Sequence, residues 1–185
     1  MLILKQCASE CSKRASCCIV GYNKGTLECH LSDDCCPVTN VVSGWNVVSK
    51  DRRCENGWIK YCNFCYLIPS EQLSWQNAVN YCNGQNGVLI RLYNQNEYVW
   101  IVTQLRNIPV STGYVWMAVV RSNGMMVYRS ETGSDLQIPI SFWGSGEPNG
   151  PAGISDCGAI VVSTAKWDDI RCSGTYQFVC KRLIS

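Results

Sequence analysis

The sequence predicts an α+β fold held together by many disulfide bonds, and three observations support this expectation. Two segments in the middle of the chain have the 3.6-residue hydrophobic periodicity of amphipathic helices, and short β-branched or aromatic runs follow them. Helices that precede a series of strands favour an α+β arrangement over a parallel α/β sheet. The third observation is that 14 of the 185 residues are cysteines, a content typical of disulfide frameworks in extracellular proteins.

The two helices are expected within residues 74–87 and 94–105. Ser74 and Asn94 are placed to cap their N-termini, and Glu97 follows Asn94 by three residues, as in a capping box. The hydrophobic residues at helical spacing are Trp75, Ala78, Val79 and Cys82 in the first helix, and Tyr98, Ile101, Val102 and Leu105 in the second. The residues expected to end the first helix are Gly84 or Gly87.

The strands are expected in the second half of the chain, where the hydrophobic period changes. They are short β-branched or aromatic runs separated by glycine-containing turns. These runs lie at residues 114–120, 125–130, 157–163 and 176–183.

A domain boundary is expected near Arg52, because residues 47–58 are charged and contain Asn and Gly without hydrophobic periodicity. This divides the chain into a small module, residues 1–52, and a larger domain, residues 53–185. Seven cysteines precede residue 54, and a segment this small needs such covalent links to fold. The first residues lack the apolar core of a signal peptide, so we expect the sequence to begin inside a longer precursor.

Composition and motifs exclude several classes of function. The net charge of +2 and the lack of a basic run argue against nucleic-acid binding. No apolar stretch approaches the roughly 20 residues of a membrane span. His30 is the only histidine, so a His-activated nucleophile would depend on one residue of the small module. Cys62 and Cys65 have the CxxC spacing of thioredoxin-like enzymes, but no βαβ pattern surrounds them. We therefore expect no enzymatic activity.

From Cys54 to Arg182 the order of landmarks resembles a C-type lectin-like domain of the long form. The landmarks are CENGWIKYCNFCY at 54–66, Cys82 at the end of the first helix, WMAV at 116–119, EPN at 147–149, WDD at 167–169 and FVC at 178–180. The resemblance implies a disulfide-rich α+β fold with two helices, antiparallel sheets and a long loop region. Residues 1–52 resemble a PAN/apple module that lacks its opening strand, and such modules commonly contact other proteins.

The resemblance also implies disulfide pairings. They are Cys54–Cys65, Cys82–Cys180 and Cys157–Cys172 in the larger domain, and Cys7–Cys29 and Cys11–Cys17 in the small module. The other cysteines, Cys18, Cys35, Cys36 and Cys62, allow three pairings. A bridge between the adjacent Cys35 and Cys36 would be strained, so we expect one of them to bind Cys18 and the other to bind Cys62. Such a bridge to Cys62 would link the two modules.

A calcium-dependent sugar site is implied in the region from EPN to WDD. Calcium prefers oxygen ligands, and the implied ligands are Glu147, Asn149, Ser155, Asp168 and Asp169. In the family, the peptide bond before the proline of EPN is cis, a form accessible mainly before proline, and it turns the neighbouring side-chain oxygens toward one ion. The residues implied to bind the sugar as well are Glu147, Asn149, Asp168 and Asp169. Glu147 would accept a hydrogen bond from a sugar hydroxyl, and Asn149 would donate one.

Three positions depart from the family pattern. Ser155 stands where mannose-type members have glutamate, and Asp168 stands where they have asparagine. Asp168 restores the carboxylate that Ser155 loses, but it replaces a hydrogen-bond donor beside the sugar with an acceptor. Gly150 stands where many members place an aspartate of an auxiliary calcium site, so we expect at most one calcium ion.

The leading hypothesis is a secreted, calcium-dependent carbohydrate-binding protein. The EPN form implies mannose, glucose, N-acetylglucosamine or fucose as the bound sugar, because galactose is usually bound through QPD. The alternative hypothesis is a calcium-independent protein-binding or adhesion module in which the lectin-like fold has lost sugar binding. Ser155 and Asp168 are the residues that favour this alternative.

Overall fold

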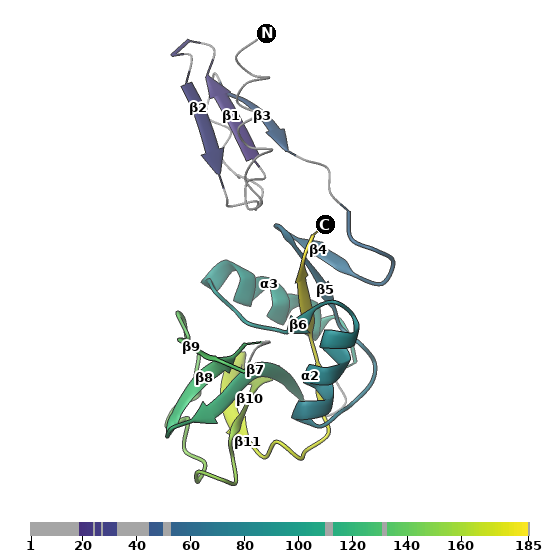
Figure 1. The fold of residues 1–185 in the computed structure, drawn as a ribbon, viewed down its shortest axis with the longest axis vertical. Coiled ribbons are helices and arrows are strands. Elements are labelled where there is room, and N and C mark those ends of the chain that lie inside the picture. Colours follow the sequence, from purple (N-terminus) through teal and green to yellow (C-terminus); the bar gives the residue numbers. More distant parts are fainter. Residues whose placement is uncertain are drawn as a thin grey trace. The chain divides into compact units, whose positions relative to one another are not determined.

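A computed structural model describes most of the chain beyond residue 52 and parts of the segment before it. The described residues are 19–23, 25–26, 28–32, 45–49, 53–109, 113–130 and 133–184. The chain forms two compact units, one of residues 1–65 with 183–185 and one of residues 66–182 (Figure 1). The predicted boundary near Arg52 stays a prediction.

A three-stranded antiparallel sheet lies in the N-terminal part of the chain. Its strands are β1 (Ile19–Asn23), β2 (Glu28–Ser32) and β3 (Trp45–Ser49), in the order β2-β1-β3. Asn23 stabilises the turn that leads from β1 toward β2, because its Oδ1 accepts hydrogen bonds from the backbone N–H groups of Gly25 and Thr26. The assignment to a PAN/apple module stays a prediction. The expected bridges Cys7–Cys29 and Cys11–Cys17 lie outside the described side chains.

The remaining elements are two helices and a series of strands, most of which follow the helices. In chain order they are β4 (Ile59–Tyr61), β5 (Phe64–Leu67), α2 (Trp75–Gly84), β6 (Val88–Leu89), α3 (Gln95–Arg106), β7 (Tyr114–Ser122), β8 (Met125–Arg129), β9 (Asp135–Leu136), β10 (Cys157–Val161), β11 (Lys166–Ile170), β12 (Gln177–Phe178) and β13 (Cys180–Leu183). No helix among the described residues combines the length and the apolar character that crossing a membrane would require. The predicted α+β fold with two helices and antiparallel sheets is confirmed, although β4 and β5 precede the helices and β6 lies between them.

Helix α2 starts where the sequence predicts, but the left-handed residue that follows its end is not one of the predicted glycines. Ser74 occupies the N-cap position with extended backbone, although its side chain makes no capping hydrogen bond. The helix ends at Gly84, and Asn86, not a glycine, takes the left-handed conformation with φ of 54°. The N–H groups of Gly87 and Asn86 donate to the carbonyls of Cys82 and Asn83, respectively, which is a Schellman motif. Asparagine tolerates this conformation, so it can serve in place of glycine.

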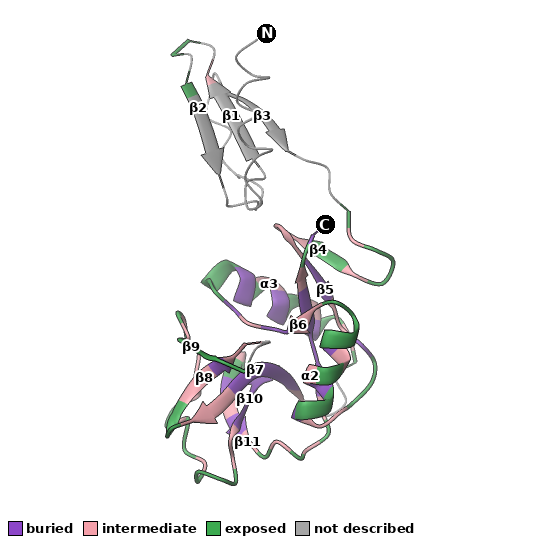
Figure 2. Cartoon of the chain, viewed as in Figure 1, coloured by how far each residue is buried: buried purple, intermediate pink, exposed green. Residues whose placement is uncertain are grey.

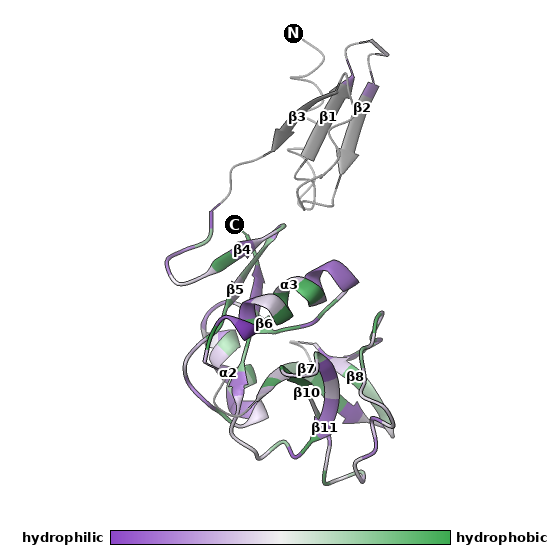
Figure 3. Cartoon of the chain, turned by 180° about the vertical axis from the view of Figure 1, so that it is seen from behind, coloured by the Kyte–Doolittle hydropathy of each residue, from purple (hydrophilic) through white to green (hydrophobic). Residues whose placement is uncertain are grey.

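Helix α3 buries the predicted face. Asn94 caps it, because its side chain accepts a hydrogen bond of 2.8 Å from the N–H of Glu97. The residues of the inward face are Tyr98, Ile101, Val102 and Leu105, and all of them are buried. Hydrophobic and hydrophilic positions both occur along this helix (Figure 3), as expected of an amphipathic helix that covers a core.

Glu97 has a different role from the one its spacing suggests. Its side chain is buried, and Oε2 accepts a hydrogen bond from the N–H of Tyr93 rather than closing a reciprocal pair with Asn94. Oε1 accepts from the hydroxyl of Tyr66 and forms a short ion pair with the ammonium of Lys181. Burial lowers the pKa of Lys181, and the Glu97 carboxylate partly offsets this effect. Glu97 is therefore the centre of a buried polar network.

The larger sheet forms the core of the unit of residues 66–182. Its strand order is β11-β10-β7-β8-β9, the pairs are antiparallel, and β12 pairs with β7 in parallel. The largest fully buried side chains in this sheet are Trp116, Trp167, Tyr128 and Phe178. Figure 2 shows β7 and β10 as largely buried strands, whereas the outer faces of α2 and α3 are exposed. A second sheet has the order β4-β5-β13-β6.

Two strand predictions need correction. The WDD segment lies within β11, which the sequence did not predict as a strand. Adjacent aspartates are unusual in strands, and pairing with β10, rather than local propensity, places them there. The run predicted at 176–183 is divided at Val179 into β12 and β13, which pair with different sheets. Periodicity alone does not show which neighbour a strand will pair with.

Disulfides tie distant segments together. The described bridges are Cys54–Cys65, Cys82–Cys180 and Cys157–Cys172, with Cα–Cα distances of 5.7, 5.2 and 5.2 Å. They are the pairings that the family resemblance implies for the larger domain. Cys62 is also disulfide-bonded, and its partner lies outside the described side chains, as do the expected pairings of Cys18, Cys35 and Cys36.

Candidate metal and ligand site

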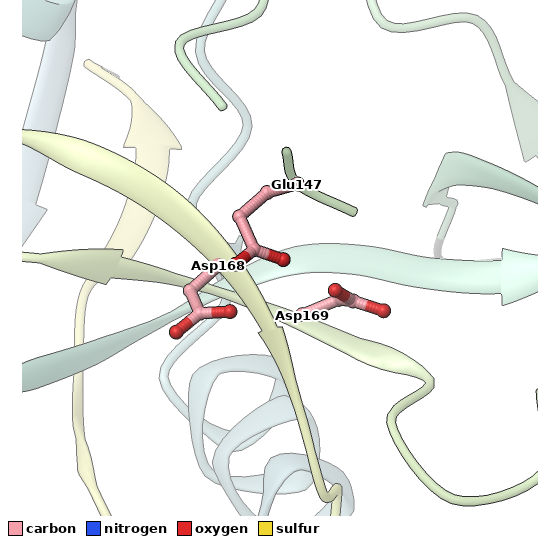
Figure 4. Close-up of side chains that lie close together, drawn as sticks. All are labelled: Glu147, Asp168 and Asp169. Carbon is pink, nitrogen blue, oxygen red and sulfur yellow. The ribbon is translucent and has the colours of Figure 1, made fainter. Parts of the chain in front are cut away.

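Three carboxylates converge where a loop meets strand β11. Glu147 comes from the loop between β9 and β10, whereas Asp168 and Asp169 are neighbours on β11 (Figure 4). Each residue offers one oxygen atom, and these atoms all lie within 4.8 Å of one another. The structure thus brings together three of the residues implied by the resemblance.

Backbone hydrogen bonds hold the loop against β11. The N–H of Trp167 donates to the carbonyl of Phe142 (2.8 Å), and the N–H of Gly144 donates to the carbonyl of Trp167 (2.9 Å). The N–H of Glu147 then donates to the carbonyl of Gly144, which closes a turn in which Gly146 takes a φ of 83°. Asp168 directly follows Trp167 on the strand. The backbone bonds between the loop and Trp167 therefore bring the side chain of Glu147 close to that of Asp168.

Asn149 lies beside Glu147, with Pro148 between them. The Glu147–Pro148 peptide bond is cis. The side-chain amide of Asn149 donates to Oε1 of Glu147 (2.8 Å), and the backbone N–H of Asn149 donates to Oε2 (3.1 Å). An acceptor carboxylate and a donor carboxamide therefore stand side by side at the surface of the domain.

Asp169 is buried, and its carboxylate holds this loop in place by hydrogen bonds. Its Oδ1 accepts hydrogen bonds from the N–H groups of Asn149 (2.9 Å) and Gly150 (3.2 Å). Its Oδ2 accepts from Gly150 (3.1 Å) and from Arg121 Nη2 (2.5 Å). A side chain at position 150 would collide with this arrangement, because a Cβ there would lie 2.8 Å from Oδ2 and 2.1 Å from the Cβ of Ser155. Gly150 is thus required for the close approach of the two segments.

Ser155 and Asp156 lie in the loop beside the site, and Asp156 is not one of the three converging carboxylates. The carbonyl of Ser155 accepts a hydrogen bond from Arg121 (3.3 Å). The carboxylate of Asp156 accepts from the N–H of Gly153 and from Nε of Arg121. Both residues belong to the 150–156 loop, and their described contacts organise that loop.

Arg121 and Tyr114 were not identified from the sequence. Arg121, on β7, joins Asp169 to the 150–156 loop. Tyr114, at the start of β7, donates its hydroxyl hydrogen to Oδ2 of Asp168 over 3.4 Å. The available signal was an arginine at the end of the hydrophobic run YVWMAVV, but the partner of such a residue depends on the fold and not on local spacing.

The electrostatics of the site favour a bound cation. Burial raises the pKa of Glu147, and the neighbouring Asp168 raises it further. Burial also raises the pKa of Asp168, followed by the charge of Asp169. The pKa of the Tyr114 hydroxyl is raised by burial and then by Asp168. Nearby negative charges therefore oppose one another's ionisation, and a cation would relieve this repulsion.

The donor set fits calcium. Calcium prefers oxygen ligands from carboxylates and amide carbonyls, and the residues that supply them here are Glu147, Asn149, Asp168 and Asp169. Arg121 compensates the charge of Asp169, whereas Glu147 and Asp168 form no ion pair in the described contacts. Two carboxylates and one carboxamide are therefore available for a divalent ion, together with the lone-pair capacity that remains on Asp169.

Comparison with known proteins identifies the family. The model of the lectin C-type domain matches residues 71–182, and the chain belongs to the C-type lectin family. Human lymphocyte antigen 75 is 27% identical over 148 residues, which is 79% of this chain but 8% of that protein. The chain therefore spans only a small part of this relative.

Solved structures show the same fold. Human lithostathine at 1.3 Å resolution superposes with a TM-score of 0.63 and 25% identity, covering 71% of this chain and 91% of that one. The carbohydrate-recognition domain of cow CD23, determined in the presence of a GlcNAc2Man3 oligosaccharide, superposes with a TM-score of 0.60 and 23% identity. The match covers 72% of this chain and 98% of that one. Members of this family are generally binding proteins rather than enzymes, and their C-type lectin domains typically bind calcium.

Proposed function

We propose that residues 53–185 form a calcium-dependent carbohydrate-recognition domain of the mannose type. The observation that carries this proposal is the convergence of Glu147, Asp168 and Asp169 beside Asn149. An acceptor and a donor held next to an ion-binding group of carboxylates is the arrangement needed to orient two neighbouring sugar hydroxyls.

Each residue has a distinct part in this proposal. Glu147, Asn149, Asp168 and Asp169 would hold the ion. Bound calcium supplies coordination positions for two adjacent sugar hydroxyls. Glu147 accepts a hydrogen bond from one hydroxyl, and Asn149 donates to the other. The EPN order of acceptor and donor corresponds to mannose, glucose, N-acetylglucosamine or fucose.

Tyr114 supports sugar binding despite Asp168. The aspartate cannot donate a hydrogen bond where mannose-type members have asparagine. The Tyr114 hydroxyl lies 3.4 Å from Oδ2 of Asp168 and belongs to the same surface. Its single hydrogen, which is donated to Asp168 here, would turn to the oxygen of a sugar hydroxyl, and that hydroxyl would in turn donate to Asp168.

The other parts of the proposal concern the setting of this domain. The disulfide content favours an extracellular, secreted protein. The PAN/apple-like segment would add a protein contact to the glycan contact of the lectin domain.

A second candidate is a protein-binding module that needs no calcium. The observation that favours it is the state of Asp169, whose oxygens already accept from Arg121 and from two backbone N–H groups. In this case the loop would be a rigid surface for another protein, and the carboxylates would not hold an ion.

Retention on sugar matrices separates the two candidates. We expect the protein to bind mannose matrix in millimolar calcium, to be released by chelator, and to be displaced by free mannose much more readily than by galactose. Exchanging the acceptor and donor, by combining Glu147→Gln with Asn149→Asp, should shift the preference toward galactose. Asp135→Asn is the matched control, because Asp135 pairs with Arg129 (3.0 Å) outside the site. Retention that ignores chelator would contradict the first candidate, and a lack of retention in calcium would favour the second.

A further inference from the structure

Arg121 makes four described side-chain hydrogen bonds near the candidate site. It lies on β7, and its side chain is only 13% exposed. Nη2 donates to Asp169 Oδ2 (2.5 Å), to the carbonyl of Gly150 (3.2 Å) and to the carbonyl of Ser155 (3.3 Å). Nε donates to Asp156 Oδ1 (3.2 Å). One guanidinium thus joins β7, β11 and the 150–156 loop.

The acceptors around this guanidinium are the kind that would otherwise need water or an ion. Two are carboxylates, and two are backbone carbonyls of the 150–156 loop. A planar guanidinium with several fixed donors can satisfy acceptors in different directions at once. The cation that organises this loop is therefore part of the chain itself.

A chain of hydrogen bonds connects Arg121, through Asp169, to the proposed ligand residues Asn149 and Glu147. Arg121 holds Asp169 through Oδ2, and the other oxygen of Asp169 accepts from the backbone of Asn149. The backbone and side chain of Asn149 in turn donate to the Glu147 carboxylate. Displacing Arg121 would thus disturb the backbone at Asn149, although Arg121 touches neither Asn149 nor Glu147 in the described contacts.

We propose that Arg121 is a positioning residue that orders the 150–156 loop and the Asp169 carboxylate before any ion binds. This inference rests on the proposed function only where it concerns calcium affinity. An ion then binds to an ordered loop, and little of its binding free energy is spent on folding the loop. If the loop were ordered only part of the time, the apparent affinity would fall by that fraction.

Arg121 also affects calcium affinity through its charge, and this effect opposes the effect of loop order. A positive charge close to the site repels calcium, so removing it would raise the affinity if charge were the main influence. Loss of loop order would lower the affinity. The two effects have opposite signs, and a single titration distinguishes them.

The test replaces Arg121 with methionine, which keeps a long side chain but removes the charge and the donors. Arg129→Met is the matched control: it makes the same substitution on the neighbouring strand, where Arg129 contacts only Asp135 and the carbonyl of Gly133 in the described bonds. Arg121→Lys keeps the charge without the planar set of donors. Asp156→Asn weakens one contact of Arg121 and provides a milder variant if Arg121→Met does not fold.

Amide hydrogen exchange in chelator measures loop order without calcium or sugar. In the wild type, the N–H groups of Asn149, Gly150 and Gly153 should be protected, because each donates to a carboxylate held by Arg121. We expect Arg121→Met to increase the exchange rates of these amides at least about tenfold, without changing the rates of the α3 amides. In Arg129→Met, the exchange rates of the loop amides should equal those of the wild type. Arg121→Lys should restore protection only in part, and Asp156→Asn should affect Gly153 most.

Calorimetric titration with calcium chloride gives the second measurement. We expect calcium affinity to fall about tenfold in Arg121→Met, as it would if about a tenth of the molecules kept an ordered loop. Arg129→Met should leave it unchanged. Unaltered exchange of the loop amides in Arg121→Met, or a higher calcium affinity, would overturn the inference. If the wild type binds no calcium, the proposed function fails, but the exchange measurement still decides the role of Arg121.

Discussion

Two groups of charged side chains in the domain, one around Glu97 and one around Glu147, differ in how far their charges are compensated. In the buried group, both oxygens of Glu97 have partners, supplied by Lys181, Tyr66 and the N–H of Tyr93. In the surface group, Glu147 and Asp168 lie close together, and the described ion pairs include neither of them. Removing one partner from the buried group leaves a charge uncompensated and should cost stability, whereas the surface carboxylates repel one another and are open to a cation.

The largest expected effect comes from breaking the buried group. Glu97→Ala removes the carboxylate that compensates the charge of the buried Lys181 ammonium, and we expect a loss of about 3–5 kcal/mol in the free energy of unfolding. Urea denaturation measures this loss. Glu147→Ala, which removes a carboxylate from the surface group, is the control and should cause no comparable loss. Similar losses in both variants would contradict the distinction between the two groups.

Calcium should stabilise the domain through the surface group alone. If the dissociation constant lies at about 10⁻⁴–10⁻³ M, as in extracellular modules, 10 mM calcium adds roughly 1.4–2.7 kcal/mol by mass action. Thermal denaturation should therefore show a higher Tm in calcium for the wild type and for Asp135→Asn. Asp168→Ala should abolish the increase, and an undiminished increase in this variant would place the ion elsewhere.

The surface group should also make stability depend on pH in the calcium-free protein. A carboxyl whose pKa is raised by folding favours the folded state when protonated, and this contribution is lost as the pH rises through the folded-state pKa. The pKa values of Glu147 and Asp168 are both raised, so stability should decline above about pH 4. Urea denaturation in chelator at pH 4 and pH 7 should show a smaller decline for Glu147→Gln than for the wild type. Equal declines would show that folding does not raise the pKa of Glu147.

The smallest expected effect concerns Tyr114. Tyr114→Phe removes one hydroxyl beside Asp168, and a hydrogen bond worth about 0.5–1 kcal/mol corresponds to a roughly two- to fivefold weaker mannose affinity. Calcium affinity should change much less. Tyr176→Phe is the matched control, because the Tyr176 ring packs on Tyr114 at 5.3 Å without a described bond from its hydroxyl to Asp168. Equal effects of the two substitutions would argue against a sugar contact by Tyr114.

The helices were predictable from the sequence because their signals are local. The buried face of α3 and its cap at Asn94 follow from spacing and side-chain chemistry alone. The end of α2 was less predictable, because Asn86 can adopt the left-handed conformation that the neighbouring glycines also permit. Strand β11 was missed because its stability comes from pairing with β10, and local propensity does not report on pairing.

The candidate site was predictable only in part, for a related reason. The motifs at 147–149 and 167–169 named residues that the fold brings together, and backbone bonds between the loop and β11 explain how. Arg121 and Tyr114 reach the site from β7, which is adjacent to it in space but distant in the sequence. No spacing rule connects them to Asp168 or Asp169, so their roles became visible only in the folded chain.

The central claim is that sugar binding at Glu147 and Asn149 requires calcium. The most direct measurement is the NMR signal of the Asn149 side-chain amide, which donates to Glu147 and would donate to the sugar. Mannose should shift this signal in a saturable manner in millimolar calcium and leave it unchanged in chelator, and galactose should have little effect in either condition. A mannose-dependent shift of equal size in chelator, or no shift in calcium, would contradict the account.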